Sequence, residues 1–361
     1  MLKIHVLYEH SKDLRPHGSG YIRLLRPLTH PSIEGAFQLS WGLEYEPADV
    51  VIIERTVKPG MTLRLAEEYV KRARADRSRL IYTIDDNLLD LKIQGPVRYA
   101  FTTEEMMVVR YFARAADGLI VSTEHLKERL SRFNDRIEVV PNALDERLVS
   151  SRRLGENESR GGNGRKLLGF MGTLTHDSDL MMVLQALRET LRKHKDEVEF
   201  QLVGGIADRA VLDLFEGLPV RQLDVGDHVE YPAFMKWMSE NVWWDMAIAP
   251  LEDNPFTRCK SDIKFLDYSI IGIPGIYSRV PPYEKTVRHM ETGYLAANDN
   301  KDWLEALERL LTVDSLRKDL GGRSQHYVLS SRTLEHCARN WREAILSLVN
   351  DRNQSATRGE V

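Results

Sequence analysis

The amino-acid sequence alternates short apolar runs with longer stretches of helical periodicity. In the first part, the apolar runs are rich in β-branched residues and bounded by Gly, Pro, Asn or Asp, as strands usually are. They span residues 3–9, 49–55, 79–85, 117–123 and 137–142. Helical spacing of apolar positions occurs between them, over residues 62–76, 103–115 and 124–133. Because near-continuous apolar strands must be covered on both faces, the pattern predicts a doubly wound parallel sheet.

A second unit of the same kind follows a polar interruption. Residues 150–166 are polar and rich in glycine, which predicts a linker or mobile loop. The alternation then resumes, with expected strands at 166–172, 198–205, 228–232, 245–250 and 275–278 and expected helices at 179–194 and 234–241. The chain from residue 301 is strongly helical. We therefore predict an α/β protein with two doubly wound domains, residues 1–150 and 151–325, and a C-terminal segment of residues 326–361 with a frayed tail.

Composition narrows the classes of protein to consider. The 361 residues are 42% hydrophobic and 29% charged, which is ordinary for a globular chain. A net charge of -4 gives no overall reason to expect nucleic-acid binding. Cys259 and Cys337 are the only cysteines, too few for a disulfide framework or a four-sulfur zinc site. No apolar run is long enough for a signal peptide or a membrane span, so we expect a cytoplasmic protein.

One loop and helix combine a buried pattern with charge. The stretch "KSDIKFLDYSIIGIP", residues 260–274, has an apolar stripe at helical spacing, and Ser261 is its expected N-cap. Arg258, Lys260 and Lys264 crowd the helix start, where the helix dipole disfavours cations unless an anion binds. The alternative is a solvated helix end with a surface ion pair between Lys264 and Asp267. The residues alone leave both interpretations open.

This stretch resembles the donor-binding segment of GT-B glycosyltransferases of the GT4-like group (glycosyl transferases group 1), in a Lys-Ser-x-x-Lys variant. Aligned on Gly272-Ile273-Pro274, the family acid that holds the donor ribose falls on Asp267, whereas an earlier family acid is replaced by Cys259. Segments 139–145, 167–180 and 291–311 are also similar to family segments, in the same order. The resemblance implies two Rossmann-like domains facing each other across a cleft, with the C-terminal helix crossing back to the first domain.

The resemblance places a nucleotide-sugar donor on the second domain. The family usually carries a basic pair just after its Gly-Thr turn, but here His176 and two acids follow Gly172 and Thr173. Cations at the start of the 260–274 helix would then neutralise the departing diphosphate without a metal ion, which gives Lys264 a catalytic role. The expected donor-binding residues are Gly172, Thr173, His176, Arg258, Lys260, Ser261, Lys264 and Asp267, and the expected nucleobase pocket is formed by Tyr231, Ala233 and Phe234.

In the first domain, "PHGSGYIRLLRPL" resembles the family's glycine-rich loop after the first strand. Two glycines let backbone approach a sugar or phosphate closely, although most such loops bind nothing. The arginine that follows at helical spacing either reaches a phosphate or covers the surface. The expected acceptor or phosphate loop comprises His17, Gly18, Ser19, Gly20 and Arg23.

Asp85 and Asp86 follow the third predicted strand, at the position where many family members carry His-Asp. A carboxylate there would steady positive charge at the anomeric carbon or accept the acceptor's proton. The alternative is that both acids cap the backbone locally. A divalent-metal role, as in GT-A glycosyltransferases, requires a different acid spacing and a different fold, so we expect no metal and no cofactor.

The sequence is thus identified as that of a glycosyltransferase of hexosyl type. The resemblance implies transfer of a sugar from a nucleotide sugar to a glycan or lipid-linked acceptor, with retention of configuration, in bacterial polysaccharide or glycoconjugate assembly. The basic run at 70–79 is either a solvated helix face or a contact with the inner face of a membrane. Two alternatives remain: a non-catalytic homologue that binds nucleotide or glycan, and a GT-B epimerase that acts on the donor alone.

Overall fold

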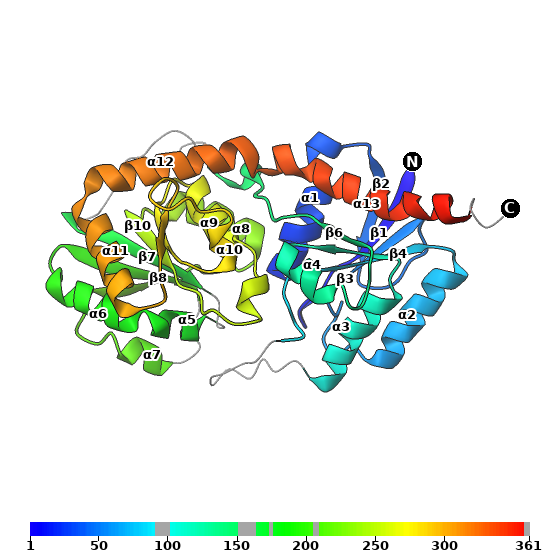
Figure 1. Ribbon diagram of the computed structural model, residues 1–361, viewed down its shortest axis with the longest axis horizontal. Helices are drawn as coiled ribbons and strands as arrows, with labels where there is room; N and C mark the ends of the chain where they lie inside the picture. The colour runs from blue at the N-terminus through cyan, green and yellow to red at the C-terminus, as the bar shows by residue number, and fades with distance from the viewer. Residues whose placement is uncertain (91–101, 151–163, 173–175, 205–208, 357–361) are drawn as a thin grey trace.

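The computed structural model describes residues 1–90, 102–150, 164–172, 176–204 and 209–356, and shows two α/β domains side by side (Figure 1). The N-terminal domain has a six-stranded parallel sheet in the order β2-β1-β3-β4-β5-β6. Its strands are β1 (Leu2–Leu7), β2 (Phe37–Gly42), β3 (Val50–Glu54), β4 (Arg79–Ile84), β5 (Gly118–Val121) and β6 (Ile137–Val139). Strands β3 and β5 are buried throughout, as their near-continuous apolar sequences predict.

Helices cover both faces of this sheet. One face carries α2 (Leu63–Ala75) and α3 (Thr103–Ala115), whose apolar stripes pack on β3 and β4, and α4 (Glu124–Leu130) lies beside them. The other face carries η1 (Gly20–Leu25), a π-helix, with α1 (Arg26–Leu28), η2 (Pro31–Ile33) and the final helix of the chain. The predicted doubly wound arrangement is confirmed.

The C-terminal domain repeats the architecture, with a parallel sheet in the order β12-β11-β10-β7-β8-β9. Its strands are β7 (Lys166–Gly172), β8 (Val198–Gly204), β9 (Val220–Leu223), β10 (Met246–Ala249), β11 (Gly275–Ser278) and β12 (Tyr294–Ala296). Its helical segments are α5 (Asp177–Met182), α6 (Leu184–Lys193), α7 (Arg209–Asp213), α8 (Tyr231–Asn241), η6 (Thr257–Cys259), α9 (Ile263–Ile270), α10 (Pro281–Glu284), α11 (Asn300–Thr312) and α12 (Asp314–Ser331). Helices α8, α9 and α12 cover one face, and α6 and α11 cover the other.

Several predicted elements differ from the structure. The expected strand at 228–232 is wrong, because residues from Tyr231 begin α8 and Pro232 occupies its first turn, a position that suits proline. Three strands were not predicted, namely β2, β9 and β12. β2 and β9 are edge strands with several exposed side chains, and β12 has only three residues, so none shows a clear apolar run. The predicted linker at 150–166 lies mostly outside the described residues.

The chain crosses between the domains twice. Residues of η3 (Glu146–Leu148) lead into the second domain, and α13 (Leu334–Ala356) returns from α12 to pack Trp341 and Ile345 on the first sheet (Figure 1). The two crossings touch through a β-bridge between Leu144 and Thr333. In the described part of the chain, no helix combines the length and hydropathy needed to cross a bilayer.

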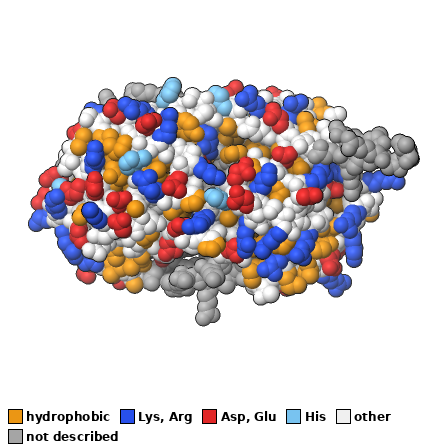
Figure 2. Space-filling model, in the orientation of Figure 1, with side chains coloured by type: hydrophobic (Ala, Val, Ile, Leu, Met, Phe, Trp, Pro, Cys, Tyr) orange, Lys and Arg blue, Asp and Glu red, His pale blue; other side chains and the backbone are white. Residues whose placement is uncertain are grey.

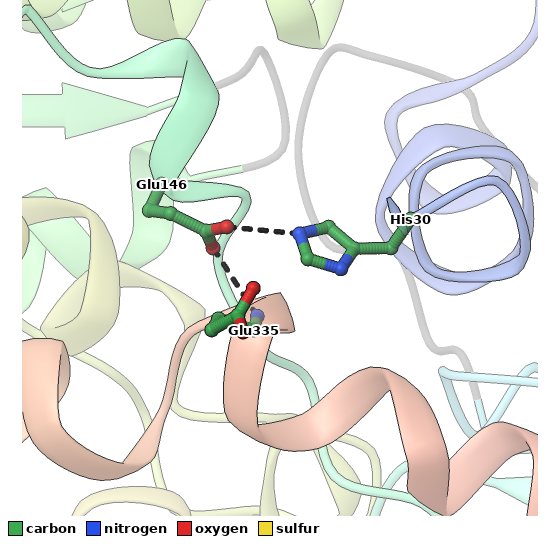
Figure 3. A group of neighbouring side chains, drawn as sticks. All are labelled: His30, Glu146 and Glu335. Atoms are coloured by element: carbon green, nitrogen blue, oxygen red, sulfur yellow. Dashed lines mark hydrogen bonds and ion pairs between the residues drawn. The ribbon is translucent and has the colours of Figure 1, made fainter. Parts of the chain in front are cut away.

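Figure 3 shows a polar link at these crossings, between His30, Glu146 and Glu335. The Nε2 atom of His30 lies 2.8 Å from Glu146 Oε1, and the backbone N–H of Glu335 donates to Glu146 Oε2 over 3.4 Å. The Nδ1 atom of His30 accepts from the backbone N–H of Ser32, so Nε2 carries the ring proton and donates to Glu146. This donor set suits a hydrogen-bonded link that ties η2, η3 and α13 together.

Candidate functional site

The domains meet where strands β4, β5 and β6 of the first sheet end. The loop between β10 and α9 seats there, so that Lys260 Nζ lies 3.4 Å from Asp86 Oδ1 and the Thr123 hydroxyl donates to the carbonyl of Cys259 over 2.9 Å. Asn87, next to Asp86, donates to the same loop. The structure thereby joins the predicted catalytic acids of one domain to the predicted donor-binding helix of the other.

The start of α9 differs from the prediction. The N-cap residue is Asp262 rather than Ser261, and the Ser261 hydroxyl instead accepts from Asn142 Nδ2 across the domain boundary over 2.9 Å. The Asp262 carboxylate pairs with Arg332 Nη1 at 2.8 Å and accepts from the Thr286 hydroxyl. Both residues at the helix start are therefore used to hold neighbouring elements in place.

Lys264 and Asp267 are buried inside α9, with 8% and 3% of their surface exposed, so the surface ion pair is wrong. The Lys264 ammonium group lies 5.1 Å from the centre of the Phe170 ring and makes no hydrogen bond or ion pair with the described residues. Burial lowers the pKa of Lys264 to about 8. A buried cation without a carboxylate partner is costly, which favours the anion-binding interpretation over the solvated one.

Asp267 is oriented by α8. Its Oδ1 accepts a hydrogen bond from the Tyr231 hydroxyl over 3.0 Å, and burial raises the pKa of Asp267 to about 7. Tyr231, Ala233 and Phe234 lie in the first turns of α8, where Phe234 stacks on Trp237 with ring centroids 6.2 Å apart. The predicted ribose anchor and the predicted nucleobase residues are thus adjacent, on a helix rather than an extended segment.

The turn after β7 is tightly packed. Gly172 precedes residues 173–175, which include the predicted Thr173 and lie outside the described residues. A Cβ on Gly172 would meet the Phe170 ring at 2.9 Å, and a Cβ on Gly204, at φ +90°, would lie 2.0 Å from the Gly172 carbonyl oxygen. Both glycines are therefore required for β7 and β8 to end side by side.

His176, at the start of α5, is mostly buried beside this turn and is neutral. Its Nδ1 lies 2.7 Å from Asp179 Oδ2, and Asp179 Oδ1 accepts from the backbone N–H of Glu252 over 2.8 Å. Burial, together with the charge of Lys264, lowers the pKa of His176 to about 4. Because Nδ1 donates its proton to the Asp179 carboxylate, Nε2 of the neutral ring can only accept a hydrogen bond, so His176 does not replace the basic pair.

Arg258 is placed differently from Lys260 and Lys264. Its guanidinium group forms a two-pronged pair with Asp253, at 2.5 Å and 2.9 Å, and 56% of its side chain is exposed. The predicted cationic group therefore reduces to Lys260 and Lys264 in this arrangement.

The first domain contributes a buried cluster of acids at the carboxyl ends of β1, β3 and β4. Glu9 Oε2 lies 3.1 Å from Arg55 Nε, and Arg55 Nη1 lies 3.9 Å from Asp85 Oδ1. Burial and the nearby Asp86 carboxylate raise the pKa of Asp85. Burial opposes ionisation of Asp86 too, but Lys260 and Arg55 hold its pKa below the usual value. The pKa values of these two neighbouring acids are therefore shifted in opposite directions.

Glu54 lies at the centre of this cluster and was missed by the sequence reasoning. Its Oε2 accepts from the backbone N–H of Glu9 over 2.8 Å, while its Oε1 is buried without a partner among the described residues. Burial, with the negative charges of Asp85 and Glu9, raises the pKa of Glu54 to about 8. The sequence does contain a pattern that would have indicated Glu54, because Glu54 and Arg55 come at the end of an apolar strand just as Asp85 and Asp86 do.

The glycine-rich loop lies over the cluster. His17 and Gly18 are exposed, whereas Ser19 and Gly20 are buried, and a Cβ on Gly20 would lie 3.2 Å from Glu54 Oε2. The Ser19 hydroxyl has no partner within the described residues. The loop thus closes the polar cluster from one side and leaves a buried hydroxyl facing inward.

Arg23 does not cover the surface, which was one of the two interpretations of the sequence. Its side chain is 1% exposed, its guanidinium lies 4.8 Å from the centre of the Trp341 ring, and Nη1 donates to Asn142 Oδ1 over 2.9 Å. Its Nε and Nη2 atoms have no partner among the described residues. Arg23 therefore links β6 and α13 to the loop, and its charge faces the carboxylates of Asp85 and Glu54.

Among the described residues, the group that could offer three ligand atoms to a metal ion is His30, Glu146 and Glu335. This group lies at the domain crossings (Figure 3), on elements other than those that carry Asp85, Asp86 and Lys264. The described acids at the candidate site do not form such a group.

Comparison with known proteins agrees with this geometry. Residues 165–313 match the family model described as Glycosyl transferases group 1. The chain is similar in structure to Anabaena HepE in complex with UDP-glucose, at 14% identity and a TM-score of 0.66, over 96% of this chain and 100% of that one. The fold is GT-B.

Other GT-B structures resemble the chain less completely. Sucrose-phosphate synthase from Thermosynechococcus elongatus matches at 16% identity and a TM-score of 0.62, over 83% of this chain and 73% of that chain. TarM matches at 14% identity and a TM-score of 0.59, over 83% of this chain but only 54% of its own length. No curated protein sequence matches the chain. At these identities the structural likeness establishes the GT-B architecture.

Proposed function

We propose that this chain is a glycosyltransferase that transfers a hexosyl group from a nucleotide sugar to a hydroxylated acceptor. The observation that carries the proposal is the buried ammonium group of Lys264 on α9, which has no hydrogen bond or ion pair with the described residues. Lys260, at the start of the same helix, contacts Asp86 of the other domain. A nucleoside diphosphate supplies the anion that Lys264 lacks. Charge on the leaving diphosphate is then stabilised by groups already in place.

The donor-binding roles follow from the geometry of α8 and α9. Asp267, held by the Tyr231 hydroxyl, is suited to accept hydrogen bonds from ribose hydroxyls, and Phe234 borders the same helix start. Lys260 and Lys264 supply two positive charges for the diphosphate, so we propose that the reaction needs no metal ion. HepE was solved with UDP-glucose, which makes UDP-glucose the first donor to test.

The acceptor side is proposed to be the acid cluster of the first domain. Its buried oxygen atoms on Ser19, Glu54 and Asp85 have no hydrogen-bond partner among the described residues, and they suit a polyhydroxylated sugar, which donates and accepts at each hydroxyl. Asp85, whose pKa is raised, is the proposed proton acceptor, and the ionised Asp86 is proposed to steady charge at the anomeric carbon. We further propose that the reaction retains the configuration of the anomeric carbon. The proposed acceptor is a glycan or a lipid-linked sugar, which the protein would reach through a peripheral contact with the membrane.

Calorimetric titration with UDP, GDP and dTDP and with their glucose derivatives tests donor binding. We expect saturable binding of at least one, weakened about tenfold in Asp267→Asn, which keeps the hydrogen bond from Tyr231 and hence the fold. Glu216→Gln, an exposed acid-to-amide change in the same domain, is the matched control and leaves binding unchanged. Absence of binding to any of these ligands would contradict the proposal.

Turnover separates the remaining alternatives. Release of nucleoside diphosphate in the presence of an acceptor or water supports a transferase, and EDTA should leave that rate unchanged. Isomerisation of the donor without release would instead identify an epimerase. Binding without turnover on any acceptor would favour a non-catalytic homologue, an alternative motivated by the buried Cys259 at the position of a family acid.

A further inference from the structure

A second basic region lies at the opposite end of the N-terminal sheet. A pocket of about 970 Å³ opens where β4, β5 and β6 begin, between the C-terminal ends of α2, α3 and α4. Because β4 has six residues, about 20 Å of strand separates this pocket from Asp85. Ligands of doubly wound sheets ordinarily bind at the other edge, so the pocket is separate from the candidate active site.

Arginine dominates the lining of this pocket. The side chains that line it include Arg74, Arg77, Arg79, Arg114, Arg132 and Arg136, which we call the arginine pocket. Two acids line it as well, Asp117 and Asp135. The face of the molecule in Figure 2 shows Lys and Arg side chains gathering on the lower part of the N-terminal domain, while both signs of charge mix over the other domain.

Two of the arginines are used by the fold. Arg79 Nη1 lies 3.5 Å from Asp117 Oδ1, and Arg136 donates to the carbonyls of Asp117 and Leu348, over 2.9 Å and 2.6 Å. The other four make no ion pair or hydrogen bond through their guanidinium groups with the described part of the chain: Arg74, Arg77, Arg114 and Arg132. Their donors are left for solvent or for a ligand.

Helix dipoles account for only part of this charge. Three helices end at the pocket, and each C-terminus carries about half a negative charge, which favours a nearby cation. Together they offset about 1.5 of the surplus of four positive charges that remains after Asp117 and Asp135 are counted. A surplus of about 2.5 positive charges therefore remains after the lining acids and helix ends are counted, which a simple helix-capping role does not explain.

An aromatic ring orients part of the arginine pocket. The guanidinium groups of Arg114 and Arg132 lie 5.1 Å and 4.6 Å from the centre of the Phe133 ring. Stacking on an aromatic face leaves the edge of a guanidinium free, so its N–H groups can still bind a phosphate in a two-pronged manner. Phe133 thus holds two of the four unpaired arginines together against their mutual repulsion.

We propose that the arginine pocket binds an anion that carries more than one phosphate group. The guanidinium groups of Arg74 in α2, Arg114 in α3 and Arg132 just beyond α4 would contact separate phosphates, and the pocket is large enough for several. The shared chemistry of the ligand is phosphate, whether it belongs to a soluble polyphosphate or to lipid headgroups. This proposal does not depend on the proposed glycosyl transfer.

Binding of inorganic tripolyphosphate to the full chain tests the arginine pocket. We expect saturable binding that weakens at high salt and falls at least tenfold in the double variant Arg74→Ala with Arg132→Ala. Arg192→Ala with Arg221→Ala removes the same charge from exposed positions of the other domain and should leave binding unchanged. Circular dichroism and an unchanged denaturant midpoint verify that the variants fold. Equal losses in both double variants, or no saturable binding, would overturn the proposal.

Vesicles distinguish the two sources of phosphate. The chain is sedimented with phosphatidylcholine vesicles that contain or lack phosphatidic acid, for the wild type and both double variants. Cosedimentation that requires phosphatidic acid and Arg74 with Arg132 supports the pocket and identifies headgroups as its ligands. Tripolyphosphate binding without cosedimentation supports the pocket and identifies a soluble anion. Cosedimentation that is unchanged in the Arg74/Arg132 variant overturns a role of the pocket at membranes.

Discussion

Replacement of Lys264 by methionine should stabilise the ligand-free protein while it removes binding of a nucleoside diphosphate. Methionine has a similar length, tolerates irregular packing and suits a site bordered by Phe170. The ammonium group that it replaces is buried and has no hydrogen-bond partner within the described structure. A change that deletes a proposed active-site charge yet raises the melting temperature would identify Lys264 as a residue kept for function.

The magnitude follows from the pKa of Lys264. Burial lowers this pKa from 10.5 to about 8, and each unit corresponds to about 1.4 kcal/mol, so ionised Lys264 costs the folded state on the order of 3 kcal/mol. Part of the gain is lost, because Asp267 no longer has a cation nearby. Its pKa of about 7 lets it take up a proton instead. We expect a net stabilisation of about 2 kcal/mol at neutral pH.

The pH dependence gives the sign of the effect. A lysine whose folded-state pKa is below its unfolded-state value destabilises the fold fully below pH 8, and less as the pH rises toward 10.5. The difference in unfolding free energy between the Lys264→Met variant and the wild type should therefore shrink between pH 8 and pH 10.5. By the same titration, affinity of the wild type for a nucleoside diphosphate should fall as the pH rises above 8.

Denaturant unfolding and calorimetry provide the measurements, with and without UDP. Lys236→Met, on the exposed face of α8, is the matched control and should change neither stability nor affinity. We expect the affinity of Lys264→Met for UDP to fall at least tenfold. A variant that is less stable than the wild type at pH 7 would refute the reasoning about burial, and unchanged affinity would refute the anion role.

Three further predictions concern other described positions. Glu54→Gln should stabilise the protein by on the order of 3 kcal/mol near pH 7, because burial raises the pKa of Glu54 from 4.5 to about 8 and the wild type therefore loses stability between these pH values, whereas Gln does not titrate. Unfolding measured from pH 4 to 9 should show the two proteins converging toward pH 4, and equal stability at pH 7 would contradict the burial of this carboxyl group. Gly204→Ala should lower the free energy of unfolding by several kcal/mol, because its Cβ would lie 2.0 Å from the Gly172 carbonyl oxygen. Gly217 has a similar φ of +75° but lies in open space, so Gly217→Ala should cost only about 1 kcal/mol. Similar losses in the two variants, measured by denaturant unfolding, would argue against the close approach at Gly204. Asp86→Asn should lower the rate of transfer at least 100-fold with little change in donor affinity, and a normal rate would exclude Asp86 from the reaction.

The sequence by itself determined the architecture, because its strongest signal is local. Near-continuous apolar runs such as 79–84 predict buried parallel strands, and each places the residues that follow it at the ligand-binding edge of a sheet. The apolar stripe of α9 likewise predicts a buried helix, and its burial follows from the residues themselves. The motif resemblance added the GT-B arrangement, which the structure confirms.

The tertiary structure alone decided how charges are partnered. Lys260 and Asp86 are 174 residues apart in the chain, and Ser261 and Asn142 are 119 apart, so no local pattern predicts either contact. The same holds for the arginine pocket, whose side chains come from helix ends and strand starts that meet only when the sheet aligns its strands. A charge at a helix start costs little free energy in water, but the same charge is costly when it is buried opposite a second domain without a partner. For that reason, Lys264 is an ordinary lysine in the sequence and a candidate anion-binding residue in the fold.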